Sequence, residues 1–331
     1  MTRSMYAGLV WPLVALAVLM VFNAVFTPGF FALEARDGRL FGVLVDILNH
    51  GSRVAIVALG MTVVIATGGV DLSVGAVAAV AGAVTATVVV DSPASWPFAL
   101  ACAAGVGVLC GAWNGVLVAV CRLQPIVATL VLMVSGRGLA QLVTGGSIIT
   151  FQSREIATLG NGSLLGLPVP VTLLACAAIS LWLSLRRTSL GLFVECVGDN
   201  SAAARLAGVP DRSVTILAYV LCGVLAAVSG VIECSYIKAA DANNAGQLLE
   251  LDAILAVVIG GTSLRGGRFS LVGTVVGAML MQMLTKTLYM QDVSAEIAPA
   301  PKAAAVIVVC LLQSPAFRAR IGAVLGRETA R

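Results

Sequence analysis

Charged and aromatic side chains are scarce in this sequence of 331 residues: 11% are charged, 5% are aromatic and one residue is a histidine. Hydrophobic residues make up 59% of the chain, and its mean hydropathy is +1.02. Because soluble globular domains carry about 25% charged residues, this composition excludes that class. The chain is predicted to be an all-α protein that crosses a membrane many times.

Motifs for catalysis and cofactor binding are also missing. No Gly-x-x-x-x-Gly-Lys-Ser/Thr phosphate loop is present, so we expect no ATP hydrolysis by this chain and no enzyme activity of its own. No histidine and carboxylate cluster suits catalysis or a metal, and no cofactor is expected. The eight cysteines lie mostly in apolar runs without repeated close spacing, which is typical of packing residues rather than disulfides.

Ten apolar segments are candidates for membrane helices, since a full span needs about 20 residues. They are 9–27, 52–67, 73–90, 97–120, 126–144, 168–185, 213–233, 252–261, 270–289 and 297–314. The short segment 252–261 can reach only partway across. Residues 28–53 are polar and then apolar, which predicts an interfacial helix on the outer surface, and His50 near its end is given no role. We interpret 1–331 as one transmembrane domain with a tail at 315–331.

The arginines predict an orientation. If the ten segments alternate, most arginines fall on one side, which should be the cytoplasm, so both termini are expected there. They are Arg3, Arg122, Arg186, Arg187, Arg205, Arg212, Arg265, Arg268, Arg318, Arg320, Arg327 and Arg331. This distribution explains the net charge of +4 by membrane topology and implies no nucleic-acid partner.

A weak internal repeat joins two windows, 63–75 and 257–267. In each, an apolar run ends in paired glycines (Gly68-Gly69 and Gly260-Gly261), and a polar turn and a long apolar helix follow. Hydrocarbon tolerates such a break only where protein or a water-filled cavity surrounds it. Paired interruptions in the two halves of a chain are typical of transporters, so we expect the breaks to border a route for a polar solute.

Asp71 follows the first break and has two compatible interpretations. It is well placed to cap the helix that begins near Ser73, which is the commoner role of such a residue. It could also contact solute, because an ionisable group at membrane depth often marks a pathway. Asn114 in the fourth segment is a further pathway candidate. For Arg137 and Gln141 in the fifth, bonding between helices is the commoner explanation.

The stretch 240–252 is rich in amides and carboxylates. Asn243 and Asn244 offer donors and acceptors that suit a neutral polyhydroxyl solute, but an outer loop that merely turns the chain would have the same composition. Glu250 and Asp252 precede the short segment and could cap it. Asp252 is kept with Asp71, Ser73, Asn114, Asn243 and Asn244 as a pathway candidate.

The loop 186–212 on the predicted cytoplasmic side has helix signals at both ends. Residues 199–201 (DNS) form an N-cap cluster, 202–207 are rich in alanine, and Gly208 with Pro210 forms a stop signal. A mere connector does not need two caps, so we favour a helix that docks on a partner. Glycine spacings in 105–115 and 273–277 predict close helix packing.

With these residues in view, the chain resembles the permease subunits of ribose-type ABC sugar importers. The likeness covers about residues 40–315 and is carried by residues 60–75 (GMTVVIATGGVDLSVG) and 250–264 (ELDAILAVVIGGTSL). The family's cytoplasmic coupling loop is matched by Gly198, Asn200, Ala203, Ala204 and Gly208. A narrower likeness to galactofuranose permeases lies in 37–42 (DGRLFG), 46–49 (DILN) and 240–246 (ADANNAG). The turn 265–268 (RGGR) departs from the family in being more basic.

The resemblance implies import of a monosaccharide, galactofuranose, from periplasm to cytoplasm across a bacterial inner membrane. It also implies an ATP-binding subunit, a second permease that is a different chain, and a periplasmic sugar-binding protein. Two alternatives stay open at this point: an ion-coupled secondary transporter, and a permease for another small polar solute such as ribose.

Overall fold

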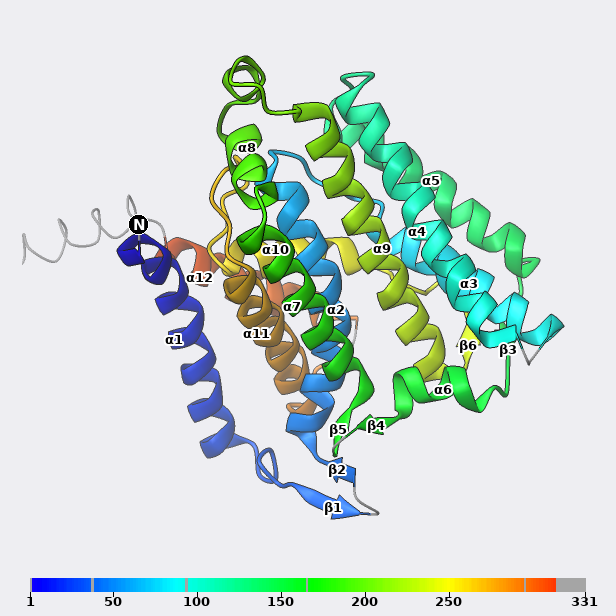
Figure 1. Cartoon of the computed structure of the whole chain (residues 1–331). Coiled ribbons are helices and arrows are strands. Elements are labelled where there is room, and N and C mark those ends of the chain that lie inside the picture. The colour runs from blue at the N-terminus through cyan, green and yellow to red at the C-terminus, as the bar shows by residue number, and fades with distance from the viewer. Residues whose placement is uncertain (1, 37–38, 93–94, 165, 295, 314–331) are drawn as a thin grey trace, which may run out of the picture.

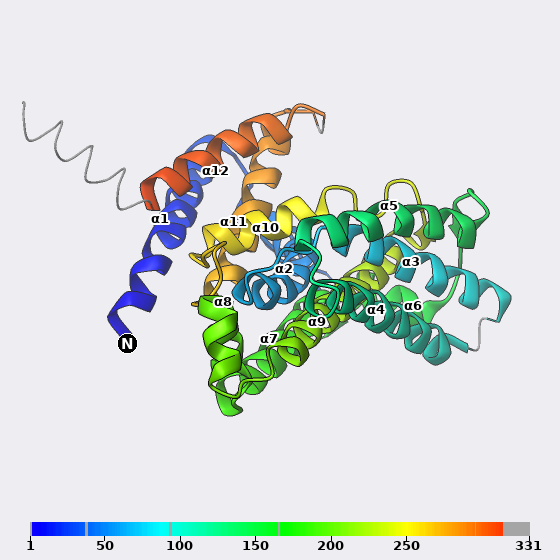
Figure 2. The same cartoon turned by 90° about the horizontal axis from the view of Figure 1, so that it is seen from above.

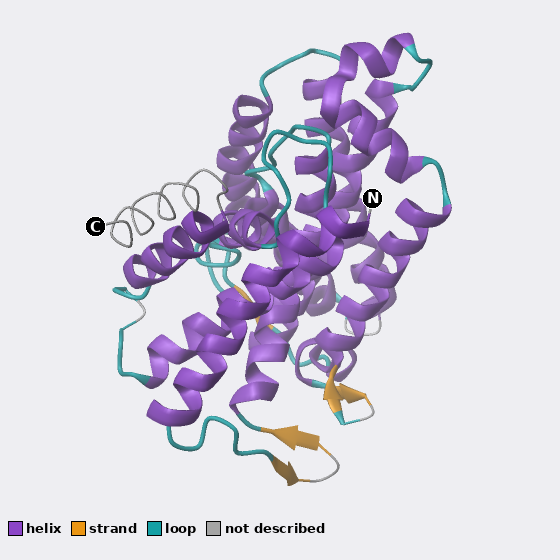
Figure 3. Cartoon of the chain, turned by 90° about the vertical axis from the view of Figure 1, so that its left-hand side faces the viewer, coloured by secondary structure: helices purple, strands orange, loops and turns teal. Residues whose placement is uncertain are grey.

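The computed structural model describes residues 2–36, 39–92, 95–164, 166–294 and 296–313. Helices dominate these residues, and the few strands are short (Figure 3). The helices are α1 (Thr2–Phe26), α2 (Val43–Ala66), α3 (Val74–Asp91), α4 (Trp96–Ala119), α5 (Pro125–Thr144), α6 (Arg154–Asn161), α7 (Val169–Arg187), α8 (Leu190–Leu206), α9 (Asp211–Ile237), α10 (Leu249–Ile259), α11 (Leu271–Met290) and α12 (Pro299–Gln313). The expected tail 315–331 lies outside the described residues.

All ten predicted apolar segments are helices. Within the described residues, eight helices are long and apolar enough to cross a membrane: α1–α5, α7, α9 and α11. The other two, α10 with 11 residues and α12 with 15, are too short for a full span of about 20. The chain is therefore an all-α polytopic membrane protein with shortened helices among its spans.

The predicted interfacial helix in 28–53 is wrong. Glu34–Arg36 (β1) and Arg39–Phe41 (β2) form an antiparallel hairpin, and residues 43–53 are the first turns of the spanning helix α2. The error arose because Asp46, His50 and Arg53 interrupt the apolar pattern. Two of these residues have partners on other helices: Asp46 pairs with Lys286 of α11, and the Arg53 guanidinium lies 5.4 Å from the ring centre of Tyr236 on α9.

The helix α2 forms the centre of the molecule. Residues 55–66 are all buried, and α2 packs against α7, α9, α10 and α11. In Figures 1 and 2, α1 and α12 lie at one edge and α3, α4 and α5 at the opposite edge. Only 11% of the apolar stretch of α1 is buried, against 72% for α2, so α1 presents its apolar surface to lipid.

The two ends of the bundle differ in their connections. At one end are the hairpin β1–β2, α6, and the hairpin of β4 (Ser163–Leu164) with β5 (Leu167–Pro168), as Figure 1 shows. At the other end are α8 and the turn between α4 and α5. Between α9 and α10 the chain pairs β6 (Ala239–Ala240) with β3 (Ile149–Thr150).

Glycines on α4 allow it to approach α9 closely. A Cβ atom on Gly107, Gly111 or Gly115 would lie 2.4–2.8 Å from α9 backbone atoms. The predicted close packing is confirmed for these three positions, for Gly277 against Ala256 of α10 and for Gly273 against Gly260 directly after α10. It is wrong for Gly105, where nothing lies within 4 Å of the position that a Cβ atom would take.

We predict that Gly111→Val destabilises the fold whereas Gly105→Val does not. The added side chain at 111 meets the Tyr219 carbonyl oxygen at 2.4 Å and must push α4 and α9 apart. Overpacking of this kind costs about 1–3 kcal/mol. Thermal unfolding of the purified protein should show a lower midpoint for Gly111→Val only. Equal midpoints for both variants would contradict the proposed packing role.

Candidate translocation and coupling site

The two predicted breaks have the same backbone geometry. After α2, Gly68 has φ +85°, its N–H donates to Ile65 O at 2.9 Å, and the next N–H donates to Val64 O at 3.1 Å. After α10, Gly261 has φ +86°, and the same two bonds run to Val258 O at 3.0 Å and Val257 O at 3.2 Å. This is the Schellman arrangement, in which a left-handed glycine ends a helix and satisfies its last carbonyls.

The first break continues into a buried polar cluster that joins three of the predicted residues. The Oδ1 atom of Asp71 accepts from the Ser73 N–H at 2.9 Å, from the Ser73 hydroxyl at 2.6 Å and from the Asn114 amide at 3.3 Å. The same amide donates to the Ser73 hydroxyl oxygen at 2.9 Å. Asp71 therefore bonds the chain directly before α3 and anchors it to α4.

This cluster is closed off from solvent. Asp71 is 1% exposed, and Ser73 and Asn114 are fully buried. Tyr219 of α9 covers the break, with its hydroxyl donating to Val70 O at 3.4 Å. In this conformation no solute can touch these three side chains without a rearrangement of α4 or α9.

The segment 241–248 holds the other predicted amides and is bound by α5. Gln141 donates to the Asn243 side-chain oxygen at 2.8 Å. Arg137 donates to Ala245 O and, at 3.0 Å, to Gly246 O. Asn243 and Asn244 lie closer to the surface than the Asp71 cluster: Asn243 is exposed, as is the side-chain bond of Asn244 to Asp241. Bonding between helices, the expected explanation for Arg137 and Gln141, is therefore wrong: both bind a non-helical segment.

Within 241–248 the Asn244 amide donates to Asp241 Oδ2 at 2.7 Å. This bond, together with the N–H groups of residues 243 and 244, holds the pKa of Asp241 below its usual range. Asp241 thus remains ionised and keeps the turn closed at neutral pH.

Two glutamates contribute to this region: Glu233, which was not predicted, and Glu250, which was expected only to cap the short helix. Glu233 of α9 accepts from the Gly246 N–H at 3.2 Å. Glu250 lies in the first turn of α10, and its Oε2 atom is buried without a hydrogen-bond partner among the described residues. Gly75 of α3 makes room for this contact, since a Cβ there would lie 2.4 Å from Gly246 O and 2.5 Å from Glu250 Oε2. A charge inside an apolar segment was the available sequence signal for Glu233.

Asp252 stands apart from the other pathway candidates. Its carboxylate accepts from Lys302 of α12 at 2.6 Å, which joins α10 to α12. The expectation that Glu250 and Asp252 precede and cap the short helix is wrong, because α10 begins at Leu249 and contains both. The structure thus separates the predicted pathway residues into three places: the buried cluster, the segment 241–248 and this ion pair.

The predicted docking helix forms the second half of α8. Asn200 has extended backbone angles (φ −158°, ψ 100°), so α8 bends there, and its side-chain oxygen accepts from the Ala203 N–H at 3.0 Å. The helix ends at Leu206, and Gly208 has φ +84° with the same pair of Schellman bonds as the two breaks. Both predicted caps are confirmed. Leu206 at the tip is 91% exposed.

Gly198, directly before the bend, touches the end of α2 at the first break and the turn that follows the second break, in both cases through backbone atoms. A Cβ atom there would lie 1.8 Å from Ala66 O at the end of α2 and 2.5 Å from the Gly267 nitrogen. The Gly267 N–H in turn donates to Ala66 O at 2.9 Å. The turn that departs from the family pattern, 265–268, is thus packed between α8 and the first break. We call this contact the glycine junction; its residues are Ala66, Gly68, Gly198, Gly266 and Gly267.

The comparisons with known proteins agree with this architecture. Residues 43–312 match the family model described as the branched-chain amino acid transport system / permease component. The galactofuranose transporter permease protein YtfT of Escherichia coli (strain K12) is 49% identical over 96% of this chain and 94% of its own.

Two further relatives are named as sugar permeases. The fructose import permease protein FruF of Bifidobacterium longum (strain NCC 2705) is 38% identical over 95% of this chain and 89% of its own. The ribose import permease protein RbsC of Escherichia coli (strain K12) is 39% identical over 91% of this chain and 92% of its own. No solved structure matches the chain. With a family model that covers most of its length and several extensive likenesses, the chain belongs to this permease family, which includes the permeases of ABC sugar importers.

Proposed function

We propose that the protein imports a monosaccharide, galactofuranose, from the periplasm across the bacterial inner membrane into the cytoplasm. ATP hydrolysis on a partner subunit drives the cycle, and a periplasmic sugar-binding protein delivers the sugar. The glycine junction carries this proposal, because it joins α8 by backbone contact to the end of α2 and to the turn 265–268 that follows α10.

The orientation follows from the arginines at the α8 end. Arg122, Arg186, Arg187, Arg205 and Arg212 occupy helix ends and connections there (Figure 1). Arginine-rich connections favour the cytoplasmic side. We therefore assign the α8 end and both termini to the cytoplasm, and β1–β2 and α6 to the periplasmic side.

The second half of α8 is the proposed contact with the ATP-binding subunit. Its alanine-rich surface permits close approach, and the exposed Leu206 is an apolar anchor in an otherwise polar connection. Gly198, Asn200, Ala203, Ala204 and Gly208 keep their proposed coupling role: Asn200 and Gly208 fix the ends of the helix, and the Ala203 N–H donates to the Asn200 cap.

The segment 241–248 is the proposed wall of the sugar pathway. Asn243 is exposed, and neighbouring α5 exposes Val131, Val134 and Leu142. An apolar helix face beside accessible amides suits a second permease, a different chain, with the sugar passing along Asn243 and Asn244 between the two subunits. In this proposal the buried cluster around Asp71 does not touch the sugar. It fixes the chain between the first break and α3. Asp252 contributes to the pathway indirectly, through its ion pair with Lys302 of α12.

The test of function is ATPase activity of the reconstituted transporter, with the binding protein added unloaded or loaded with galactofuranose or ribose. We expect stimulation by the galactofuranose-loaded protein. Stimulation by the ribose-loaded protein alone would support an importer whose sugar is ribose, which is consistent with the 39% identity to a ribose permease. Failure of the chain to associate with any ATP-binding subunit would refute the proposal and favour an ion-coupled transporter.

We predict that Gly198→Ala uncouples the transporter. The new methyl group would lie 1.8 Å from Ala66 O, so α8 must move away from the end of α2 and from the turn 265–268 while its exposed surface stays intact. ATP hydrolysis should persist and sugar uptake into proteoliposomes should fall at least tenfold. Gly138→Ala on α5, where nothing lies within 4 Å, is the control. Normal uptake by Gly198→Ala would contradict the junction.

Asn114 and Asn244 should respond differently to replacement by alanine. Asn114→Ala removes a buried donor from Asp71 and Ser73 and should cost about 1–3 kcal/mol of stability. Asn244→Ala, nearer the surface, should leave the melting temperature nearly unchanged but reduce sugar uptake several-fold. Measurements of unfolding and uptake on both variants check this. If Asn114→Ala were as stable as the wild type and altered the sugar preference, the sugar would contact the buried Asp71 cluster rather than the segment 241–248.

A further inference from the structure

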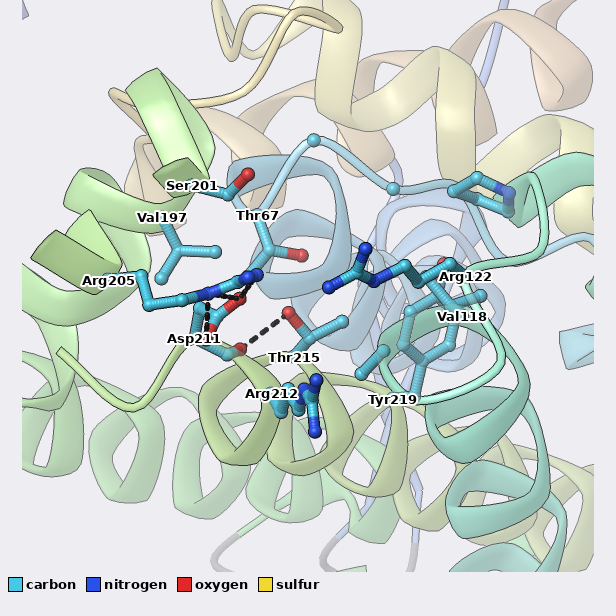
Figure 4. Close-up of a pocket in the computed structure, with 14 residues that line it drawn as sticks. Thr67, Val118, Arg122, Val197, Ser201, Arg205, Asp211, Arg212, Thr215 and Tyr219 are labelled. Atoms are coloured by element: carbon cyan, nitrogen blue, oxygen red, sulfur yellow. Dashed lines mark hydrogen bonds and ion pairs between the residues drawn. The ribbon is translucent and has the colours of Figure 1, made fainter. Parts of the chain in front are cut away.

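A polar cavity of about 370 Å³ lies at the α8 end, where the end of α2, the α4–α5 turn, the tip of α8 and the start of α9 meet (Figure 4). Its volume falls within the range of about 300–1,000 Å³ that is typical of small-molecule sites. It is distinct from the segment 241–248. The lining residues that matter here are Thr67, Arg122, Ser201, Arg205, Arg212 and Thr215.

The cavity carries excess positive charge. Three guanidinium groups and one carboxylate line it. Asp211 binds Arg205 with both oxygens, through contacts of 3.2, 3.2 and 2.5 Å, so that pair neutralises itself. Arg122 and Arg212 have no side-chain hydrogen bond or ion pair within the part of the chain that the structure describes. Two cationic donors therefore remain for a ligand.

Arg122 is held in an unusual conformation. Its φ of +57° lies in the left-handed region, which residues with a side chain rarely adopt. In Figure 4 the guanidinium groups of Arg122 and Arg205 enter the cavity from opposite sides. Asp211 already balances the charge of Arg205, so the charge of Arg122 faces the cavity without a partner, and an anion beside it would lower its electrostatic energy. The guanidinium group also matches the geometry of phosphate oxygens.

Hydroxyl groups of the wall complement the cations. Thr67 donates its hydrogen to Val64 O at 2.7 Å, and Thr215 donates its hydrogen to Asp211 O at 2.9 Å. Their hydroxyl oxygens are then available as acceptors for ligand hydroxyl groups. A ligand that suits both sets of groups has a phosphate and several hydroxyls.

We propose that this cavity binds a phosphate ester that carries hydroxyl groups. Two sources share this chemistry: a soluble sugar phosphate and a phosphoglycerol lipid headgroup. The two unpaired guanidinium groups suit the near-dianionic phosphate of a monoester at neutral pH. Basic pockets between membrane helices also accept anionic lipid headgroups.

A bound ester would join the docking helix to the core. Ser201 and Arg205 belong to α8, whereas Thr67 and Arg122 belong to the end of α2 and the α4–α5 turn. A ligand that bridges them restrains the motion of α8. On the proposed function, which this step assumes, the ester therefore slows sugar-stimulated ATP hydrolysis, and in the proposed orientation it acts from the cytoplasm.

The test measures binding to the complete transporter in nanodiscs of phosphatidylcholine. Glucose 6-phosphate is the probe, and glucose and inorganic phosphate are compared with it. We expect glucose 6-phosphate to bind most tightly and its Kd to rise at least tenfold in Arg122→Gln and in Arg212→Gln. Arg187→Gln is the matched control, because Arg187 lies at the same end, stacks near Trp182 and is not part of the cavity.

A second arm distinguishes the two sources. Nanodiscs that contain phosphatidylglycerol are prepared, and retained lipid is measured by native mass spectrometry. Retention that is lost in Arg122→Gln, with displacement of glucose 6-phosphate, identifies the lipid headgroup. Binding that phosphatidylglycerol does not affect identifies the soluble ester.

Three results would overturn the proposal: no binding in either arm, an equal loss in Arg187→Gln, or no effect of the two cavity variants when their melting temperatures match the wild type. Binding is measured without transport, so a failure of the proposed sugar import leaves this result interpretable. ATPase activity with and without glucose 6-phosphate then tests the restraint on α8, and unchanged activity despite binding would refute that step.

Discussion

The fold of this protein depends on satisfying backbone hydrogen bonds where water is absent. An α-helix leaves the carbonyl groups of its last turn without intrahelical partners, and in hydrocarbon each such group would cost several kcal/mol. The chain meets this constraint twice in the same way, with a left-handed glycine after α2 and after α10 that returns two N–H groups to the last helical turn. Because the glycine N–H groups bond the last carbonyls of each helix, polar side chains near the breaks are free to make other contacts, as Asp71 does with Ser73.

Glycine solves a second problem at the same place. The contact of α8 with the breaks occurs between backbone atoms, at distances that a single methyl group would prevent. Such a contact has little freedom to slide, whereas a contact through long side chains would bend before it transmitted a displacement. The glycine junction would therefore suit the proposed transfer of motion from α8 to α2, and its tight geometry makes it sensitive to small substitutions.

The polar groups of the interior fall into two kinds that differ in exposure. Asp71, Ser73 and Asn114 bond one another behind Tyr219, and these bonds hold the bend before α3. The second kind lies on the non-helical segment 241–248, which side chains of α5 hold in place. A transporter needs both kinds: buried groups that keep the broken helices in place, and accessible groups that offer weak, reversible hydrogen bonds to a neutral solute.

Local signals in the sequence were enough to identify the apolar helices, both glycine breaks, the two caps of the docking helix and the membership of a permease family, because each depends on residues within a few positions of one another. Residues 43–53 were misassigned because the charges of Asp46 and Arg53 find their partners on α11 and α9, far along the chain. Tertiary structure also separated Asp252 from the other candidates and assembled the arginine-lined cavity from four distant segments. The physical reason is common to these cases: which charge meets which depends on how whole helices pack, and no short stretch of sequence contains that information.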